Sequence, residues 1–564
     1  MSQIITMEDL ATEYAGMEDM LLDYACEQDA GVWCLRHRKI RNKPITFTHP
    51  TDARRHRPWQ YDMLRDEHPN KVYEKGRQLG MSELGITEFI QFADTHPNIK
   101  EMYTFPRSTQ MEDFVKTRVN PMFDTSEYLK AILNPEMNSL SLKQIRESFL
   151  LFRSAWGSEL GEGADIDMIA FDEYDRMKDN VELAFTEGLS SSPYGRLRRW
   201  STPSIPGRGV DLVYSKSDMR KYMWKCEHCG TYQEGGLSFE HNVIQVNPHG
   251  FDKITEEIQP GTFIIGCRKC NKEINRMGQG IWVPEKPSIR DTRGYLISQL
   301  DAAWISADEI MRKYYAYRTK SIQLFYNYVI GQAYTNNGLI ITKDDILTAR
   351  HTPGIIGHRD HMKYQYICVG IDWGLNNWVV VKGVQKNGQV DLLNAFWVED
   401  LRNQPLGQVD QIAAMLAPYE PDIIIADAGY GADRNPHLLS KFPGRVFACD
   451  WDEYEDGTHF TASFNENQHT CSINRSAQLK KVMHILKAKK YGLPEWCDKM
   501  AMYAKHAGNL RVMECENEKT HSVYEVVVRV GDDHLACASA YAQIGVDRLT
   551  EFGKPNTTGF QFGF

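Results

Sequence analysis

The segment 75–82 has the residue types of a loop that binds nucleotide phosphates, with its lysine displaced. The standard loop reads G-x-x-x-x-G-K-[ST]: backbone N–H groups surround the phosphates, the lysine reaches the β- and γ-phosphates, and the hydroxyl binds Mg²⁺. Here Gly80 and Ser82 hold the second glycine and hydroxyl positions, but Met81 replaces the lysine. Lys75 replaces the first glycine, and its long side chain can still reach a phosphate from there. The segment predicts either a phosphate site with a relocated cation or a plain turn between a strand and a helix.

Apolar residues follow this loop at near-helical spacing: Leu84, Ile86, Phe89, Ile90 and Ala93. We therefore expect a helix whose N-terminus points at the loop. The positive end of a helix dipole favours an anion at that position.

A second strand could supply the acids that a phosphate loop needs. The apolar run 168–171 is followed directly by Asp172 and Glu173. Asp172 would bind Mg²⁺, directly or through water, and Glu173 would orient and deprotonate the attacking water. The alternative is an apolar strand that carries acids at its solvent end. Loop and strand together favour a nucleotide hydrolase.

Two weaker motifs flank this pair. Trp59 and Gln60 offer an aromatic face and an amide that could stack on an adenine and hydrogen-bond to it. Ser201, Thr202 and Pro203 place small hydroxyls where they could sense a γ-phosphate. Each motif alone is more simply a turn.

Four of the twelve cysteines form two C-x-x-C knuckles: Cys226 with Cys229, and Cys267 with Cys270. Four thiolates suit a closed, tetrahedral, structural zinc site. His228, inside the first knuckle, could replace a thiolate but is a poorer choice. The alternative is four unligated cysteines, and the other eight cysteines are expected to be small core residues.

The C-terminal part contains a second α/β pattern with acids at strand ends. An apolar strand ends at Asp372, and two further strands flank an Asn387-Gly388 turn, which is a good hairpin signal. A helix near 409–416 and a strand that ends at Asp427 come next. Three antiparallel strands, a helix and a further strand is an order that resembles the ribonuclease-H fold.

That resemblance makes the first and fourth strands neighbours, so that Asp372 and Asp427 would lie side by side. Adjacent carboxylates repel each other unless cations intervene, which favours a site for Mg²⁺ or Mn²⁺. The resemblance also implies a third acid near the start of the last helix, for which Asp533 is preferred to Asp532. Asp433 is an additional candidate ligand.

The predicted fold class is α/β: a P-loop NTPase parallel-sheet domain with a zinc-ribbon-like insertion, followed by a ribonuclease-H-like nuclease domain. The expected boundaries are a helical lead-in at 1–50, an ATPase domain at 51–350 with its insertion at about 222–275, a linker at 351–360, a nuclease domain at 360–549 and a flexible tail at 550–564.

Composition bounds the function classes. The chain has 564 residues, of which 42% are hydrophobic and 25% are charged. No long apolar run and no signal peptide is present, so we expect a soluble, intracellular protein that uses no membrane. The net charge of -10 argues against a protein that coats nucleic acid but leaves local basic patches open. One such patch, Arg196, Arg198 and Arg199, is predicted to be a solvated face.

Together these motifs resemble the large terminase subunit of tailed phages, in the branch related to the phage lambda enzyme, whose loop lysine is similarly displaced. The resemblance implies nucleotide contacts at the loop residues Lys75, Arg77, Gly80 and Ser82. Met81, which departs from the family pattern, is counted with the nucleotide-binding residues because it lies in the same loop. It implies catalytic acids at Asp172 and Glu173 and a coupling motif at Ser201-Thr202-Pro203. The nuclease acids would be Asp372, Asp427 and Asp533.

The function so implied is ATP-driven translocation of double-stranded DNA into a capsid together with metal-dependent endonucleolytic cleavage. ATP, Mg²⁺ or Mn²⁺, and Zn²⁺ would be the cofactors. The partners would be a terminase small subunit, the capsid portal and further copies of the chain in a ring, in the host cytoplasm. The alternatives are a DNA helicase–nuclease, which would normally show a second motor domain, and a non-enzymatic zinc-binding scaffold of the virion.

Overall fold

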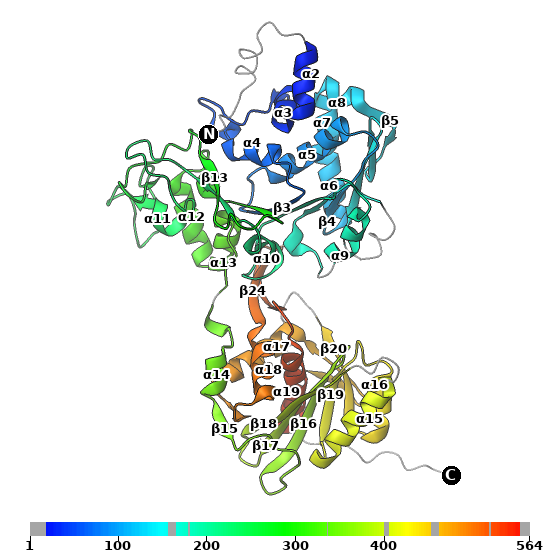
Figure 1. Cartoon of the computed structure of the whole chain (residues 1–564). Coiled ribbons are helices and arrows are strands. Elements are labelled where there is room, and N and C mark those ends of the chain that lie inside the picture. Colours follow the sequence, from blue (N-terminus) through cyan, green and yellow to red (C-terminus); the bar gives the residue numbers. More distant parts are fainter. Residues whose placement is uncertain are drawn as a thin grey trace. The chain divides into compact units, whose positions relative to one another are not determined.

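The computed structural model describes residues 19–155, 165–178, 181–335, 337–399, 405–452, 462–517 and 520–552. The chain forms two compact units, Met1–Tyr334 and Thr335–Phe564 (Figure 1). The first 18 residues of the predicted lead-in and residues 553–564 of the predicted tail lie outside the described residues. In the described part, no helix is long and apolar enough to cross a membrane.

The first unit is built on a ten-stranded sheet with the order β13-β10-β14-β3-β9-β8-β4-β7-β6-β5. Its strands are β3 (Asn70–Lys75), β4 (Lys100–Phe105), β5 (Leu133–Asn138), β6 (Leu142–Ile145), β7 (Ser148–Ser154), β8 (Met168–Asp172), β9 (Arg196–Ser201), β10 (Arg220–Met223), β13 (Ile281–Pro284) and β14 (Arg293–Ile297). The strands from β10 to β7 run parallel, and the outer strands are antiparallel. β3, β9 and β8 are adjacent and parallel, so the loop after β3 and the acids after β8 lie at the same, C-terminal end of the strands.

Helices cover both faces of this sheet. Neighbouring residues on β3 belong to different hydrophobic clusters, Tyr73 with the residues of α5 and Val72 with those of α10. Successive strand residues point to opposite faces, so α5 and α10 lie on opposite sides of the sheet. The helices of the unit are α2 (Asp19–Gln28), α3 (Ala30–His37), α4 (Pro58–Arg65), α5 (Met81–Thr95), α6 (Ser108–Phe114), α7 (Asn120–Thr125), α8 (Glu127–Ile132), α9 (Val181–Thr186), α10 (Gly209–Ser215), α11 (Phe239–Asn242), α12 (Ala307–Arg318) and α13 (Ile322–Phe325).

The N-terminal helices are part of the first unit's core. The Asp29 carboxylate caps α3 by accepting hydrogen bonds from the backbone N–H groups of Gly31 and Val32. A side chain at Gly31 would collide with the Tyr61 ring of α4, 2.4 Å away. The described part of the segment 1–50 is therefore packed tightly onto the rest of the first unit.

The cysteine-bearing segment grows out of a sheet edge. It leaves after β10 and returns at β13, which pairs antiparallel with β10. Between them lies the small hairpin of β11 (Val243–Gln245) and β12 (Phe263–Ile265). The insertion therefore lengthens the connection between β10 and β13 at the edge of the sheet and leaves the parallel strands uninterrupted.

The second unit contains a nine-stranded sheet with the order β15-β23-β18-β17-β16-β19-β20-β22-β21. Its strands are β15 (Arg350–Thr352), β16 (Tyr364–Asp372), β17 (Asn377–Gln385), β18 (Val390–Val398), β19 (Ile423–Asp427), β20 (Val446–Asp452), β21 (Ser463–Asn465), β22 (Thr470–Asn474) and β23 (Tyr491–Pro494). The three-strand meander is confirmed by the antiparallel pairs β16–β17 and β17–β18. The predicted neighbourhood of the first and fourth strands is confirmed as well, because β16 pairs parallel with β19.

The helices of this unit are α14 (Lys343–Leu347), α15 (Pro405–Leu416), α16 (Arg434–Lys441), α17 (Arg475–Lys487), α18 (Asp498–Gly508) and α19 (His534–Phe552), with a ribbon of β24 (Leu510–Glu516) and β25 (Val523–Arg529). The last helix, α19, lies against β16 so closely that a Cβ at Gly370 would come within 1.9 Å of the Ala538 carbonyl oxygen. This contact fixes the start of α19 beside the end of β16.

The division between the units lies earlier than the expected linker at 351–360. Residues 350–352 form β15, which pairs with β23 inside the second sheet. The segment from Thr335 onward therefore belongs to the second unit. The Pro-Gly turn that suggested a linker instead follows an edge strand.

Candidate active sites and zinc centre

The loop after β3 has the backbone of an anion-binding turn. Gln78 and Gly80 both have positive φ, +60° and +80°, and α5 begins at Met81. The N–H groups of Gly76 and Arg77 already donate to the carbonyls of Ile297 and Tyr328. Residues 78–82, at the start of α5, are thus the ones whose N–H groups can face a phosphate.

Lys75 and Glu173 meet at the edge of the sheet. The Lys75 Nζ lies 3.4 Å from Glu173 Oε1, and the lysine side chain is only 7% exposed. Burial would raise the pKa of Glu173, but Lys75, Arg176 and Arg77 outweigh it and hold the pKa below its ordinary value. The displaced lysine therefore lies beside the acid predicted to activate water and keeps that acid ionised.

Glu173 has a strained backbone. Its φ of +58° lies in the left-handed region, where a residue with a Cβ costs about 1–3 kcal/mol. The strain turns the chain sharply after β8, so that Glu173 faces the loop while Asp172 remains buried within the strand.

Asp172 presents one oxygen for a metal-bound water. Tyr103 donates its hydroxyl to Asp172 Oδ2 over 2.9 Å, whereas Oδ1 is buried and makes no hydrogen bond of ordinary geometry to any residue that the structure describes. Burial, followed by the nearby Glu173 charge, raises the pKa of Asp172. A buried carboxylate oxygen that lacks such a bond fits the role of Mg²⁺ ligand, since a divalent cation would supply the missing interaction.

One predicted loop contact, at the Met81 side chain, needs correction. The Met81 side chain is 3% exposed and packs in the main hydrophobic cluster, so only its backbone can serve the loop. The Arg77 guanidinium lies 3.1 Å from the centre of the Tyr328 ring and is held there as a stacked cation. Ser82 lies in the first turn of α5, as the loop motif requires.

The prediction that Trp59 stacks on an adenine is wrong for this conformation. Its side chain is fully buried, with the rings of Trp304 and Tyr222 5.9 and 6.4 Å away. Gln60 donates its Nε2 to the Leu79 carbonyl over 3.0 Å and also lines a pocket beside the loop, so its contact with a nucleotide stays a prediction. This hydrogen bond ties Gln60 to the loop at Leu79.

A pocket of about 650 Å³ lies beside the same loop. Gln78 and Gly80 of the loop line it, together with Arg57 and the half-buried Trp304. The Arg57 guanidinium lies 4.4 Å from the centre of the Trp304 ring. An aromatic plane with a cation on it is thus available at the position where Trp59 was expected to provide one. Trp304 escaped the sequence analysis because it is distant from the loop in sequence.

The segment Ser201-Thr202-Pro203 leaves β9 between the loop and the acids, at the place predicted for a coupling motif. All three residues are buried, and the Thr202 hydroxyl has no hydrogen-bond partner within the described part of the chain. The Ser201 hydroxyl accepts a hydrogen bond from the Asp175 N–H over 3.1 Å. A shift of this segment would therefore displace the turn that carries Glu173.

Asp175 is a functional candidate that the sequence analysis missed. Its carboxylate accepts hydrogen bonds from the Ser204 N–H and hydroxyl, at 2.9 and 2.7 Å, and from the Val210 N–H, at 2.6 Å. Burial nevertheless raises the pKa of Asp175 to about 6. One side chain thus joins the turn after β8, the segment after β9 and the start of α10. Its only sequence signal is its place two residues after Glu173.

We expect Asp175→Asn to lower kcat for ATP hydrolysis by about 10- to 100-fold with little change in KM, because small displacements of a catalytic group have effects of this size. The amide cannot accept all three bonds, so Glu173 should lose its position while the phosphate loop keeps its own. Asp167→Asn is the matched control: Asp167 also accepts from a backbone N–H and a serine hydroxyl, but at the opposite end of β8. An equal kcat in both variants would contradict the role.

The four knuckle cysteines form a metal-binding cluster. Their sulfur atoms all lie within 4.8 Å of one another. The distances between Cys226 and Cys270 sulfurs and between Cys229 and Cys267 sulfurs are 3.6 and 3.7 Å. A tetrahedral zinc with bonds of about 2.3 Å needs sulfurs about 3.8 Å apart, so the cluster fits Zn²⁺. His228 is exposed and lies outside the cluster.

We expect about one zinc ion per purified chain, bound by these four thiolates. Cys267→Ser should release the metal and lower the melting temperature, as measured by elemental analysis and thermal unfolding. Cys497→Ser, which changes a half-buried cysteine outside the cluster, should retain the zinc. If the folded protein contains no zinc and all four cysteines can be alkylated, the assignment of a zinc site is wrong.

The second unit brings Asp372 and Asp427 to one edge. The residues before them, Ile371 and Ala426, are paired across the parallel strands β16 and β19. Burial raises the pKa of Asp372 to about 6, against a hydrogen bond from His534, and the charges of Asp533 and Asp427 raise it further. Tyr541 donates its hydroxyl to Asp427 Oδ1 over 3.1 Å.

The third predicted acid, Asp533, is held by cations. Arg475 Nη2 lies 3.1 Å from its Oδ2 and Arg529 Nη1 lies 3.8 Å from its Oδ1. The next residue, His534, binds Asp372 instead, with 2.8 Å between Nδ1 and Oδ2. The only sequence signal for His534 is its place directly after Asp533.

Among the described residues, only the four cysteines have ligand atoms gathered closely enough to be recognised as a metal cluster. The carboxylates of the second unit share a strand edge and an electrostatic neighbourhood, and their oxygen-donor set is the one that Mg²⁺ and Mn²⁺ prefer. Their side chains would have to converge further to hold such an ion.

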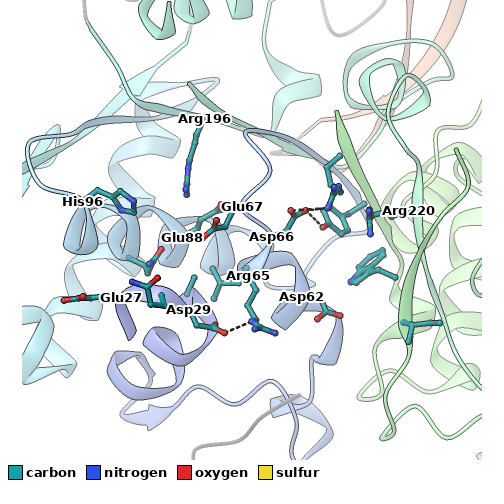
Figure 2. A pocket seen from close by; sticks show the side chains of 18 of the residues that line it. Glu27, Asp29, Asp62, Arg65, Asp66, Glu67, Glu88, His96, Arg196 and Arg220 are labelled. Atoms are coloured by element: carbon teal, nitrogen blue, oxygen red, sulfur yellow. Dashed lines mark hydrogen bonds and ion pairs between the residues drawn. The ribbon is translucent and has the colours of Figure 1, made fainter. Parts of the chain in front are cut away.

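A larger pocket, of about 870 Å³, lies at the other edge of the first sheet, where β3, β9 and β14 begin (Figure 2). Its charged side chains are largely paired within the protein. Figure 2 shows Arg65 joined to Asp29, and Asp66 is paired with Arg293 at 3.2 Å. Its described lining includes none of the predicted nucleotide-binding residues.

The basic patch near this pocket is not the solvated face that was predicted. Arg198 is fully buried, and its guanidinium shares Glu88 with the equally buried Lys71, at 2.9 and 2.8 Å. Arg199 pairs with Glu182. These cations hold α5 and α9 on the sheet.

The geometry can be set beside known proteins. Residues 58–282 match the family described as "Phage terminase large subunit gpA, ATPase domain". No curated protein matches the sequence. The large terminase of bacteriophage HK97 aligns with a TM-score of 0.52 at 11% identity, covering 92% of this chain and 99% of that chain.

Two further solved structures align less well. The ATPase domain of the Thermus phage P74-26 large terminase has a TM-score of 0.31 at 17% identity and covers 49% of this chain and 92% of that chain. A large terminase from a thermophilic bacteriophage has a TM-score of 0.30 at 11% identity and covers 84% of this chain and 93% of that chain. At such identities the HK97 alignment supports the fold, and the family match supports the ATPase domain. Residues 58–282 of this chain therefore form an ATPase domain of the phage terminase large subunit gpA type.

Proposed function

We propose that this protein is an ATP-driven motor that moves double-stranded viral DNA into a capsid and cuts that DNA with a metal-dependent endonuclease. The observation that carries the proposal is the meeting of Lys75 and Glu173, 3.4 Å apart, at the sheet edge of a terminase-type ATPase domain. Hydrolysis of a phosphate anhydride needs a cation for the phosphates and a base for the water side by side, and this pair supplies both.

In this proposal the N–H groups of residues 78–82 surround the phosphates of ATP, and Ser82 and Asp172 hold Mg²⁺. The bound metal would neutralise charge that develops on the transferred phosphoryl group. When ATP enters, Lys75 exchanges Glu173 for a phosphate oxygen, and the freed Glu173 carboxylate orients and deprotonates the attacking water. Thr202, whose hydroxyl is buried without a partner among the described residues, senses the γ-phosphate and passes its loss to Asp175.

We place the base of the nucleotide in the 650 Å³ pocket, against Trp304. The ring is half-buried, lies within reach of the loop and carries Arg57 on one face. This placement replaces the buried Trp59 as the aromatic partner.

Trp304→Ala should raise KM for ATP by about 5- to 100-fold and change kcat less, since stacking of a base on an aromatic ring has an effect of that size. The matched control is Trp496→Ala in the second unit, which also removes an accessible Trp ring beside a cation, Lys343 at 4.9 Å. Steady-state kinetics of both variants make the comparison. An unchanged KM in Trp304→Ala would remove the ring from the nucleotide site.

For the nuclease we propose Asp372 and Asp427 as ligands of Mg²⁺ or Mn²⁺, with Asp533 as the third acid of the site. His534 holds Asp372 in place, and Arg475 and Arg529 hold Asp533. A bound divalent cation would activate water and stabilise the charge on the phosphodiester.

The proposed partners are double-stranded DNA, a terminase small subunit, the capsid portal and further copies of this chain in a ring, in the host cytoplasm. A helicase–nuclease would need a second motor domain, and the second sheet instead has the strand order of a nuclease fold. A zinc-binding scaffold would need no ionised Glu173 beside a loop.

The test of the whole proposal uses the full chain. ATP turnover is measured with and without linear duplex DNA, and plasmid cleavage is measured with Mg²⁺ or Mn²⁺ and with EDTA. We expect ATP turnover that rises with DNA and plasmid cleavage that EDTA abolishes. A folded protein with neither activity would favour the scaffold.

A further inference from the structure

Two large apolar side chains are exposed beside the carboxylates of the second unit. Leu375 is 77% exposed and Tyr430 is 70% exposed. Each lies three residues beyond an acid, Leu375 after Asp372 and Tyr430 after Asp427. Because β16 and β19 are parallel neighbours, both side chains lie on loops that leave the same sheet edge.

The loops that carry them are held firmly. Asn435 joins the two: its Oδ1 accepts from the Trp373 indole N–H over 2.8 Å, and its Nδ2 donates to the Asp427 carbonyl over 2.9 Å. Arg434 adds a hydrogen bond to the Gly374 carbonyl at 3.3 Å. The exposure of Leu375 and Tyr430 therefore belongs to an ordered surface.

Tyr430 is fixed with respect to the carboxylate itself. Its backbone N–H donates to Asp427 Oδ2 over 2.9 Å. The next residue, Gly431, leaves no room for a Cβ, which would lie 2.1 Å from the Asp427 carbonyl oxygen. The backbone that carries the Tyr430 ring therefore cannot shift without moving Asp427.

The chemistry of this surface indicates what it contacts. A phosphodiester that reaches Asp372 and Asp427 brings its sugar and base within about 10 Å, the span of three extended residues. Cationic side chains bind a DNA backbone by its charge, and a Tyr hydroxyl can also donate to a phosphate, whereas the ring face of Tyr and the apolar wedge of Leu are used on bases. Such contacts require a base that is at least partly unstacked.

We propose that Tyr430 stacks on a nucleobase next to the scissile phosphate and that Leu375 wedges beside it, so that the DNA is locally unstacked before it is cut. The inference rests on the proposed nuclease function and adds the part of the substrate that is recognised. It predicts faster cleavage where bases separate easily, as at pyrimidine–purine steps and in unpaired stretches.

The first experiment compares cleavage of a duplex with cleavage of the same duplex carrying a central unpaired bubble. Tyr430→Ala and Leu375→Ala should cut the duplex about tenfold more slowly or worse. Both should recover most of the parent rate on the bubble, and Tyr430→Phe should resemble the parent on both substrates. Met362→Ala is the matched control, because Met362 is 82% exposed but precedes β16, away from these loops. Parent-like rates on the duplex, or equal losses on both substrates, would overturn the proposal.

A second measurement does not depend on cutting. Asp372→Asn protein is mixed with a duplex that contains 2-aminopurine, whose fluorescence rises when it is unstacked. We expect the fluorescence to rise. In the double variant, which carries Tyr430→Ala as well as Asp372→Asn, this rise should be absent. If the parent cuts no DNA but this rise is seen, the nuclease proposal fails while base contact stands. If cutting occurs without any rise, base unstacking is excluded.

Discussion

Lys75→Met should lower ATP turnover by at least about 100-fold, the scale on which enzymes lose activity when one charge-stabilising group is removed. Lys75 is the cation closest to Glu173, at 3.4 Å, and it ends the strand that leads into the phosphate loop. Methionine keeps most of the aliphatic stem, which is buried, and deletes only the ammonium group. The phosphates would then lose their principal point charge, and Arg77, stacked on Tyr328, cannot replace it.

ATP turnover is to be measured together with nucleotide binding and thermal unfolding. The control is Lys100→Met, which removes an exposed lysine at the start of β4, on the opposite edge of the sheet. Both variants should unfold at about the parent temperature. Full ATP turnover in Lys75→Met would show that the phosphate charge is met elsewhere and would end the displaced-lysine assignment.

The loop and its acids were predictable because their signals are local and periodic. An apolar strand followed by Asp172 and Glu173, and a glycine before an amphipathic helix, each define an element from a few adjacent residues. The same holds for Asp372 and Asp427, each of which ends an apolar strand, and the resemblance to the ribonuclease-H fold implied that these two strands are neighbours. In each case the chemistry lies at a strand end, and the parallel pairing of the strands then brings the ends together.

The failed predictions concern side chains whose environment comes from distant parts of the chain. Trp59 looked like an exposed ring, but Tyr222 and Trp304 enclose it. Arg198 looked like a surface charge, but it is buried and forms an ion pair with Glu88 on α5. No local pattern separates a tryptophan or an arginine that meets such a partner from one that meets water.

The missed residues have the same cause. Asp175 and Asn435 act by joining segments that are adjacent only in the folded chain. Their residue types are common in turns and at helix starts, where a capping role would explain them equally well. Only the contacts reveal that each supports an acid of a candidate site.

The two chemistries should be separable by single substitutions, because the two acid sets belong to different compact units. The proposed role of Glu173, on water beside a nucleotide, belongs to the first unit, whereas Asp372 and Asp427 lie on the sheet of the second. Asp372→Asn keeps the size of the side chain and its contact with His534 but removes a charge that a divalent metal needs. It should hydrolyse ATP at the parent rate and lose plasmid cleavage. Glu173→Gln should show the reverse: it should bind ATP and cut DNA when supplied with metal, yet fail to hydrolyse ATP or to package.

Measuring ATP turnover and plasmid cleavage on both variants side by side makes each the control of the other. General misfolding would lower both activities in one variant, whereas loss of one activity alone locates the chemistry in one unit. An additional readout, binding of Mn²⁺ followed by its paramagnetic resonance, should weaken in Asp372→Asn and remain unchanged in the nuclease site of Glu173→Gln. If Asp372→Asn cuts DNA at the parent rate, the strand-end acids of the second unit are not the nuclease, however well the motor performs, because a metal site cannot lose a carboxylate ligand without a loss of rate.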